Sequence, residues 1–119
     1  MRASEPVASS GIGPTGQFVA VLPAAELSAG QSRRVQVAGR LIALWHLGHT
    51  VLATDDTCTH EKASLSEGSL DVEAGQVECP RHGARFDLRT GKALTLPAYK
   101  PLRTYPVRIR DGQIEVAVG

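Results

Sequence analysis

Cys58-Thr59-His60 and Cys79-Pro80-Arg81-His82 are the two stretches that decide how this 119-residue chain folds. They hold its only two cysteines, and a histidine follows each cysteine, with one residue between them in the first stretch and two in the second. Two thiolates and two imidazoles on paired short loops make a complete four-ligand set for a metal centre. The spacing therefore predicts that both loops close around one cofactor.

This ligand set favours a 2Fe–2S cluster in which two histidines replace two cysteines on one iron. Two ferric ions and two sulfides leave two positive charges, which two thiolates cancel, whereas four thiolates would leave the oxidised cluster doubly negative. An electron enters a neutral centre more easily, so histidine ligation raises the reduction potential above that of an all-cysteine ferredoxin. The expected role is electron transfer, not bond making on a substrate.

Zinc is the main competitor, because it also binds cysteine and histidine in four-coordinate sites. Finger-type sites usually pair two cysteines at one end and two histidines at the other, whereas each end is mixed here. The segment from Glu61 to Glu78 also reads as a hairpin and not as a finger. A zinc-stabilised binding module, a disulfide, and two structural cysteines with surface histidines stay open as alternatives.

Length and charge predict one domain that carries no broad attraction for nucleic acid or membrane, since the formal net charge is +1. Residues 1–16 lack the apolar core of a secretory signal, and their Ser, Gly and Pro content is typical of a flexible tail. We therefore expect residues 17–119 to form the domain, and we expect a cytoplasmic protein.

The apolar pattern alternates, turn signals recur, and no segment holds a helical period, so the sequence predicts an all-β fold: an antiparallel sandwich or small barrel. One helical turn is expected near Ala24–Leu27. Asp111-Gly112 predicts a hairpin, because a primed turn needs positive φ at both central positions. Residues from about 57 to 97 are expected to be an insertion that carries the metal loops. The predicted strands are Phe18–Leu22, Val35–Val37, Leu41–Trp45, Val51–Ala53, Leu70–Val72, Val77–Cys79, Phe86–Leu88, Tyr105–Ile109 and Ile114–Val118.

Several further side chains have simple expected roles. Trp45 and Phe86 are expected in the core, and His46 and His49 are expected to be solvated positions beside a turn. Charge is uneven along the chain, which indicates either solvated surfaces or complementary patches that orient a transient electron-transfer encounter. The acidic residues are Asp55, Asp56, Glu61, Glu67, Asp71, Glu73 and Glu78, and the basic ones are Arg81, Arg85, Arg89, Lys92, Lys100, Arg103, Arg108 and Arg110.

Three segments resemble the soluble Rieske-type ferredoxins of bacterial aromatic-ring-hydroxylating oxygenase systems: DDTCTHEKASLSEG (55–68), VECPRHGARFDLRTG (77–91) and PAYKPLRTYPVRIRDGQIEV (97–116). The resemblance implies a Rieske fold, which is an antiparallel β-sandwich with a small cluster-binding subdomain. It also implies one 2Fe–2S cluster per chain, with Cys58 and Cys79 on one iron and His60 and His82 on the other through Nδ1. Pro97 would cover the cluster from a third side.

The same resemblance implies an electron carrier that is not an enzyme by itself. It would act as a monomer, accept one electron from a flavin-dependent ferredoxin reductase and pass it to a terminal Rieske non-haem iron oxygenase. The small Rieske subunit of a nitrite reductase complex is the alternative within this family.

The ligand loops also depart from those of high-potential Rieske proteins. Ala63 and Arg81 stand where the respiratory Rieske proteins have a pair of disulfide-bonded cysteines. Ala84 and Phe86 stand where those proteins have a Ser and a Tyr that donate hydrogen bonds to sulfur. Without these donors the reduced state is less stabilised, so we expect a reduction potential near the low end of the Rieske range, roughly −150 mV.

Overall fold

The computed structural model describes residues 17–59, 63–81, 83–96, 98 and 100–118. In these residues all regular structure is β-strand apart from two short 3-10 helices, η1 (Ala24–Glu26) and η2 (Leu65–Glu67), which confirms the all-β prediction. The strands are β1 (Gln17–Pro23), β2 (Ser32–Val37), β3 (Arg40–His46), β4 (Val51–Asp55), β5 (Ser69–Asp71), β6 (Gln76–Glu78), β7 (Arg85–Asp87), β8 (Thr104–Tyr105), β9 (Val107–Arg110) and β10 (Gln113–Val118).

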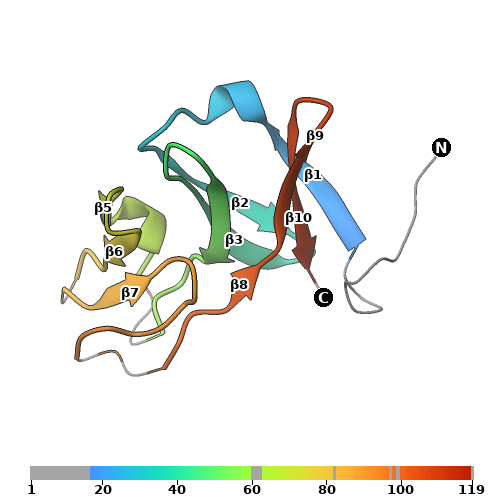
Figure 1. Cartoon of the computed structure of the whole chain (residues 1–119). Coiled ribbons are helices and arrows are strands. Elements are labelled where there is room, and N and C mark those ends of the chain that lie inside the picture. The colour runs from blue at the N-terminus through green and yellow to red at the C-terminus, as the bar shows by residue number, and fades with distance from the viewer. Residues whose placement is uncertain (1–16, 60–62, 82, 97, 99, 119) are drawn as a thin grey trace.

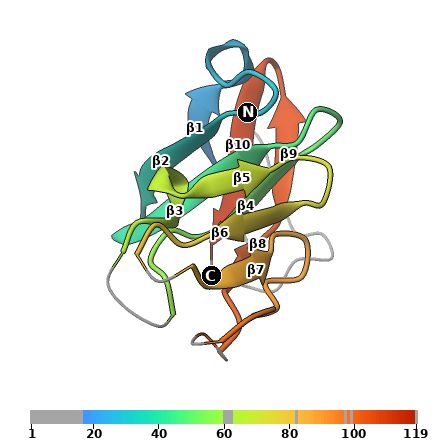
Figure 2. The same cartoon turned by 90° about the vertical axis from the view of Figure 1, so that its left-hand side faces the viewer.

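The strands form three antiparallel sheets, in the orders β1-β10-β9, β2-β3-β4-β8 and β5-β6-β7. Figure 1 shows the sheet of β1, β10 and β9 at the right and β5, β6 and β7 at the left, with β2 and β3 between them. Seen from the side, β5, β6 and β7 lie in front of the strands of the central sheet (Figure 2). The four-stranded sheet is therefore the middle layer.

Strand β3 shows how the central sheet packs against the other two sheets, one on each of its faces. Ile42 and Leu44 belong to the core shared with β10, whereas Ala43 and Trp45 belong to the core shared with the third sheet. All four side chains are fully buried. Successive side chains of a strand point to opposite faces, so a strand covered on both faces must be apolar throughout, as the run Leu41–Trp45 is.

Two tight turns connect neighbouring antiparallel strands. Asp111 and Gly112 have φ angles of 53° and 76°, and they connect β9 to β10 where Arg110 pairs with Gln113. Ala38-Gly39 has φ angles of 51° and 80° between β2 and β3. Positive φ at both central positions is the condition for a primed hairpin turn, which the sequence predicts at Asp111-Gly112.

The prediction of a strand over Tyr105–Ile109 is wrong in one respect. The alternation of Tyr105, Val107 and Ile109 predicts one strand, but Tyr105 ends β8 in the central sheet and Val107 begins β9 in the outer sheet. Pro106 separates them, and proline has no N–H to donate to a ladder. The chain therefore changes sheets at the proline, and β8 connects the central sheet to the outer one.

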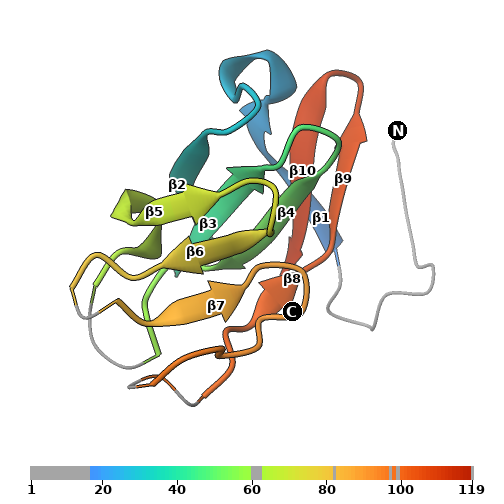
Figure 3. The same ribbon diagram turned by 60° about the vertical axis from the view of Figure 1, so that its left-hand side comes forward.

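The third sheet is also shorter than predicted. Leu70 pairs with Val77, but Val72 and Cys79 lie outside the ladder, because β5 ends at Asp71 and β6 ends at Glu78. The loop after β4, the loop between β6 and β7, and the segment after β7 come together at one end of the molecule (Figure 3). The two cysteines lie in the first two of these loops.

Candidate metal centre

Cys58 and Cys79 are buried, with 3% and 2% of their surface exposed, and they belong to the same apolar cluster. No disulfide joins them. A buried pair of thiols on loops from different parts of the chain is a donor set that a thiophilic metal cofactor fits. The two cysteines that the sequence predicts as ligands thus lie in one buried cluster.

The two cysteine loops close in the same way. The Cys58 amide donates to the Ala63 carbonyl at 3.0 Å, and the Cys79 amide donates to the Ala84 carbonyl at 2.7 Å. In both loops the donor and acceptor are five residues apart. Residues 58–63 and 79–84 are therefore called the first and second ligand loops, and a cysteine begins each of them.

The bases of the two loops differ. Thr57 and Ser64 form an isolated antiparallel bridge below the first loop. Below the second loop, Glu78 pairs with Arg85 at the end of the β6–β7 ladder, and Arg85 Nη2 lies 3.0 Å from Glu78 Oε1. The second loop is thus the end of a regular hairpin, whereas the first needs support from elsewhere.

The segment after β7 packs against both loops. Thr59 Oγ1 in the first loop donates to the Lys100 carbonyl at 2.8 Å. The Arg85 amide, at the end of the second loop, donates to Thr95 Oγ1 at 2.9 Å. At the start of this segment, Gly91 has φ +80°, and a Cβ there would lie 2.1 Å from the Leu102 carbonyl oxygen, so no side chain fits.

His60, His82 and Pro97 lie outside the described residues, so their predicted roles remain predictions. Among the residues that the structure does describe, no group of three or more potential ligands of the His, Cys, Asp or Glu type gathers. The chemistry of the donor set still fits a mixed-ligand iron–sulfur centre, because each buried cysteine is followed within its own closed loop by a histidine of the sequence.

The floor under the loops is apolar. Ala84 and Phe86 are fully buried in the same cluster as both cysteines, and neither carries a hydroxyl. Trp45 is fully buried as predicted, and its Nε1 donates to Thr54 Oγ1 at 3.1 Å. This environment excludes water and offers no side-chain hydroxyl at positions 84 and 86.

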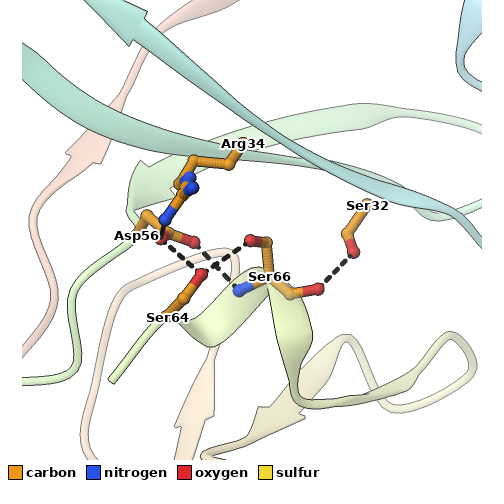
Figure 4. Close-up of polar contacts among 5 residues, drawn as sticks. All are labelled: Ser32, Arg34, Asp56, Ser64 and Ser66. Carbon is orange, nitrogen blue, oxygen red and sulfur yellow. Dashed lines mark hydrogen bonds and ion pairs between the residues drawn. The ribbon is translucent and has the colours of Figure 1, made fainter. Parts of the chain in front are cut away.

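Asp56 has a role that the sequence does not reveal, because it stands among acidic residues that are expected at the surface. Its side chain is 1% exposed. It accepts hydrogen bonds from Ser64 Oγ at 2.6 Å and from the Ser66 amide at 2.9 Å (Figure 4). The signal for it was local: an Asp two residues before the first ligand and a Ser-Leu-Ser after the loop.

Asp55, the neighbour of Asp56, faces a different partner. Its Oδ1 accepts a hydrogen bond from the Tyr105 hydroxyl at 2.5 Å. Burial, and then the hydrogen bond and negative charge of Asp55, raise the pKa of Tyr105 above its ordinary value of 10.0. This contact joins β4 to β8 just before the first loop.

The two other histidines behave differently from each other. His49 is exposed, as predicted. His46 is half-buried, and its Nδ1 lies 2.8 Å from the Leu27 carbonyl oxygen, so the prediction of a solvated side chain is wrong. This contact joins the side chain of His46 at the end of β3 to the backbone of the residue that follows η1.

A family model, known proteins and solved structures each provide chains that are similar to this one. The family model of the Rieske 2Fe-2S domain matches residues 17–106. The 3-phenylpropionate/cinnamic acid dioxygenase ferredoxin subunit of Photorhabdus laumondii is 52% identical over 93 residues, which cover 78% of this chain and 87% of that protein. Among solved structures, the ferredoxin of carbazole 1,9a-dioxygenase from Nocardioides aromaticivorans is similar with a TM-score of 0.83 and 33% identity, over 87% of this chain and 99% of that one. A chain from the complex of reduced oxygenase and oxidised ferredoxin in carbazole 1,9a-dioxygenase has a TM-score of 0.78 and 39% identity, over 84% and 92% of the two chains.

Proposed function

The chain belongs to the family of Rieske 2Fe-2S domains, and we propose that it carries single electrons to the terminal oxygenase of an aromatic-ring dioxygenase system. The observation that carries this proposal is the pair of buried cysteines, each at the start of an equivalent closed loop, in a chain similar to dioxygenase ferredoxin subunits. The chain is an electron-transfer component and not the catalytic oxygenase.

We assign Cys58 and Cys79 to one iron of the cluster and His60 and His82 to the other. The cysteines bind as thiolates and the histidines as neutral imidazoles, so the oxidised centre carries no net charge. A 2Fe-2S cluster supplies one-electron oxidation and reduction. The chain itself contributes the closed loops that hold the ligands and the apolar floor that excludes water.

The buried residues beneath the loops support a low reduction potential. Ala84 and Phe86 present no hydroxyl that could donate a hydrogen bond to sulfur. Such hydrogen bonds stabilise the electron-rich reduced state, so their absence favours the oxidised one. A potential at the low end of the Rieske range suits a carrier between a flavin-dependent reductase and an oxygenase.

The names of the relatives support an oxygenase as the proposed partner. The curated relatives are named as ferredoxin subunits of a 3-phenylpropionate/cinnamic acid dioxygenase, and one structural neighbour comes from a complex with its oxygenase. We infer that this chain serves an oxygenase acting on an aromatic compound, with phenylpropionate-type acids the first to test.

We assign residues 17–119 to the Rieske domain and about 57–97 to its cluster-binding part. No helix among the described residues has the length and apolar character needed to cross a bilayer.

Anaerobic purification followed by visible and EPR spectroscopy tests the cofactor, and reconstitution with a flavin-dependent reductase and an oxygenase tests the role. We expect a red-brown protein with acid-labile sulfide, a reduced-state EPR signal, and oxygenase turnover that requires this chain. Replacing His82 with Cys keeps four potential ligands and should alter the EPR signal and lower the potential. Fully metallated material that is colourless and free of labile sulfide would refute the proposal.

A further inference from the structure

We propose that Asp56 is the positioning residue of the first ligand loop: its buried carboxylate ties the start of that loop to the residues after its end, so that Cys58 is held in place. The inference rests on the proposed function only in taking Cys58 as a ligand. Asp56 itself is not a ligand, because its oxygens are engaged with the residues that follow the loop.

Both oxygens of Asp56 bind groups on the far side of the loop. Oδ2 accepts from Ser64 Oγ at 2.6 Å, and Oδ1 accepts from the Ser66 amide at 2.9 Å. The first distance is in the range of hydrogen bonds to a charged carboxylate. The backbone of Asp56 adds a third contact, because its carbonyl accepts from the Leu65 amide at 2.7 Å. One residue thus ties the start of the loop to three successive residues after its end.

The same network connects the loop to the central sheet. Ser32 Oγ on β2 donates to the Ser66 carbonyl at 2.9 Å, and Arg34 Nη1, also on β2, lies 4.0 Å from Asp56 Oδ2 (Figure 4). The Ser64 hydroxyl already donates its one hydrogen bond to the Asp56 carboxylate. In the 2.9 Å contact between the two serine hydroxyls, Ser66 is therefore the donor and Ser64 the acceptor. Every group of this network therefore has a partner, which a buried charge requires.

Among the described residues, no buried carboxylate lies at the base of the second loop, where the Glu78 side chain is partly exposed. Its base is a regular hairpin, in which three residue pairs join β6 to β7. The ion pair of Glu78 with Arg85 at its end is exposed and contributes little. Loss of Asp56 should therefore loosen the first loop and leave the second as it is, whereas a general loss of stability would affect both.

Hydrogen–deuterium exchange of the cluster-loaded protein, read by mass spectrometry, tests this selectivity. Peptides covering residues 57–66 and 78–86 report the first and second loops. In Asp56→Ala the first loop loses the acceptor of two hydrogen bonds, and its exchange should accelerate about tenfold or more, against less than about twofold in the second loop. Iron release to a ferrous chelator should accelerate by a similar factor.

Three further variants make the test specific. Asp55→Ala removes the same charge one residue away and breaks the contact with Tyr105 instead of the contacts with Ser64 and Ser66, so first-loop exchange should stay within about twofold of wild type. Asp56→Asn keeps an oxygen that can accept from the Ser66 amide, so it should restore part of the protection. Ser64→Ala should show a smaller increase than Asp56→Ala, confined to the same loop.

The outcomes separate this inference from the proposed function. Equal acceleration in both loops, or an equal effect of Asp55→Ala, would overturn the positioning role even if the wild-type protein is a working ferredoxin. A wild-type chain without iron would overturn the proposed function, and the exchange ratio of the two loops, then measured on the protein as isolated, would still decide whether Asp56 closes the first one. If Asp56→Ala does not fold, Asp56→Asn and Ser64→Ala decide by the same ratio.

Discussion

Replacing Leu65 with Ala should strongly destabilise the protein, because this side chain is fully buried directly after the first ligand loop. The change removes three carbon atoms, which at about 0.8 kcal/mol for each buried CH₂ gives roughly 2.4 kcal/mol. A cavity cost adds to this when the surroundings cannot collapse. Here the backbone is held by the bonds of Cys58 to Ala63 and of Leu65 to Asp56. We therefore expect a loss of about 3–5 kcal/mol.

Urea and thermal unfolding of protein loaded with cluster to the same extent measure this loss, since a bound cofactor itself adds stability. The melting temperature should fall by roughly 10–20 °C. Leu96→Ala is the matched control, because Leu96 is 80% exposed and its truncation should change the free energy of unfolding by less than about 0.5 kcal/mol. A loss below about 1 kcal/mol in Leu65→Ala would refute the idea that the core under this loop is rigid.

Three other predictions concern potential, pH and salt. Introducing hydroxyls with Ala84→Ser and Phe86→Tyr should raise the reduction potential, and potentiometric titration showing no rise would contradict the role assigned to these apolar positions. Because the pKa of Tyr105 is raised in the folded state, its neutral hydroxyl contributes stability that is present below pH 10 and is lost as the pH rises through the folded-state value. Tyr105→Phe should therefore reduce the loss of stability at alkaline pH, measured by urea unfolding at a series of pH values. Lys100 is exposed beside the first loop and should favour encounter with an acidic surface of the partner. Lys100→Glu should therefore slow reduction of the oxygenase at low salt and have a smaller effect at high salt. Equal reduction rates for the variant and the wild type at low salt would count against electrostatic steering.

The cysteine part of the candidate site could be predicted from the sequence because a short spacing separates each cysteine from a histidine, whereas the two histidines lie outside the described residues. Cys58 and Cys79, as the only cysteines and each close to a histidine, indicate a shared metal centre before any fold is known. The structure brings both thiols into one buried cluster. Asp56 was not predictable in this way, because an aspartate beside a loop is usually solvated, and only the position of Ser64 and Ser66 makes it a buried acceptor.

The fold, too, was predictable from the sequence only in part. Alternating residues and the Asp111-Gly112 turn predict the strands and their hairpin, because pleat and turn geometry depend on near neighbours. His46 and Tyr105 were misassigned because their partners are distant in sequence: His46 lies against the Leu27 carbonyl, and Tyr105 pairs with Ala53 in the central sheet.

By itself, the sequence determined the β-strands, the tight turns and the pairing of thiol with imidazole on each ligand loop, since all of these are encoded within a few adjacent residues. The tertiary structure alone decided that β3 is buried on both faces, that the chain changes sheets at Pro106, and that a buried carboxylate closes the first loop. These outcomes depend on which distant segments pack together, because burial and hydrogen-bond partners are properties of the assembled layers and not of any single stretch.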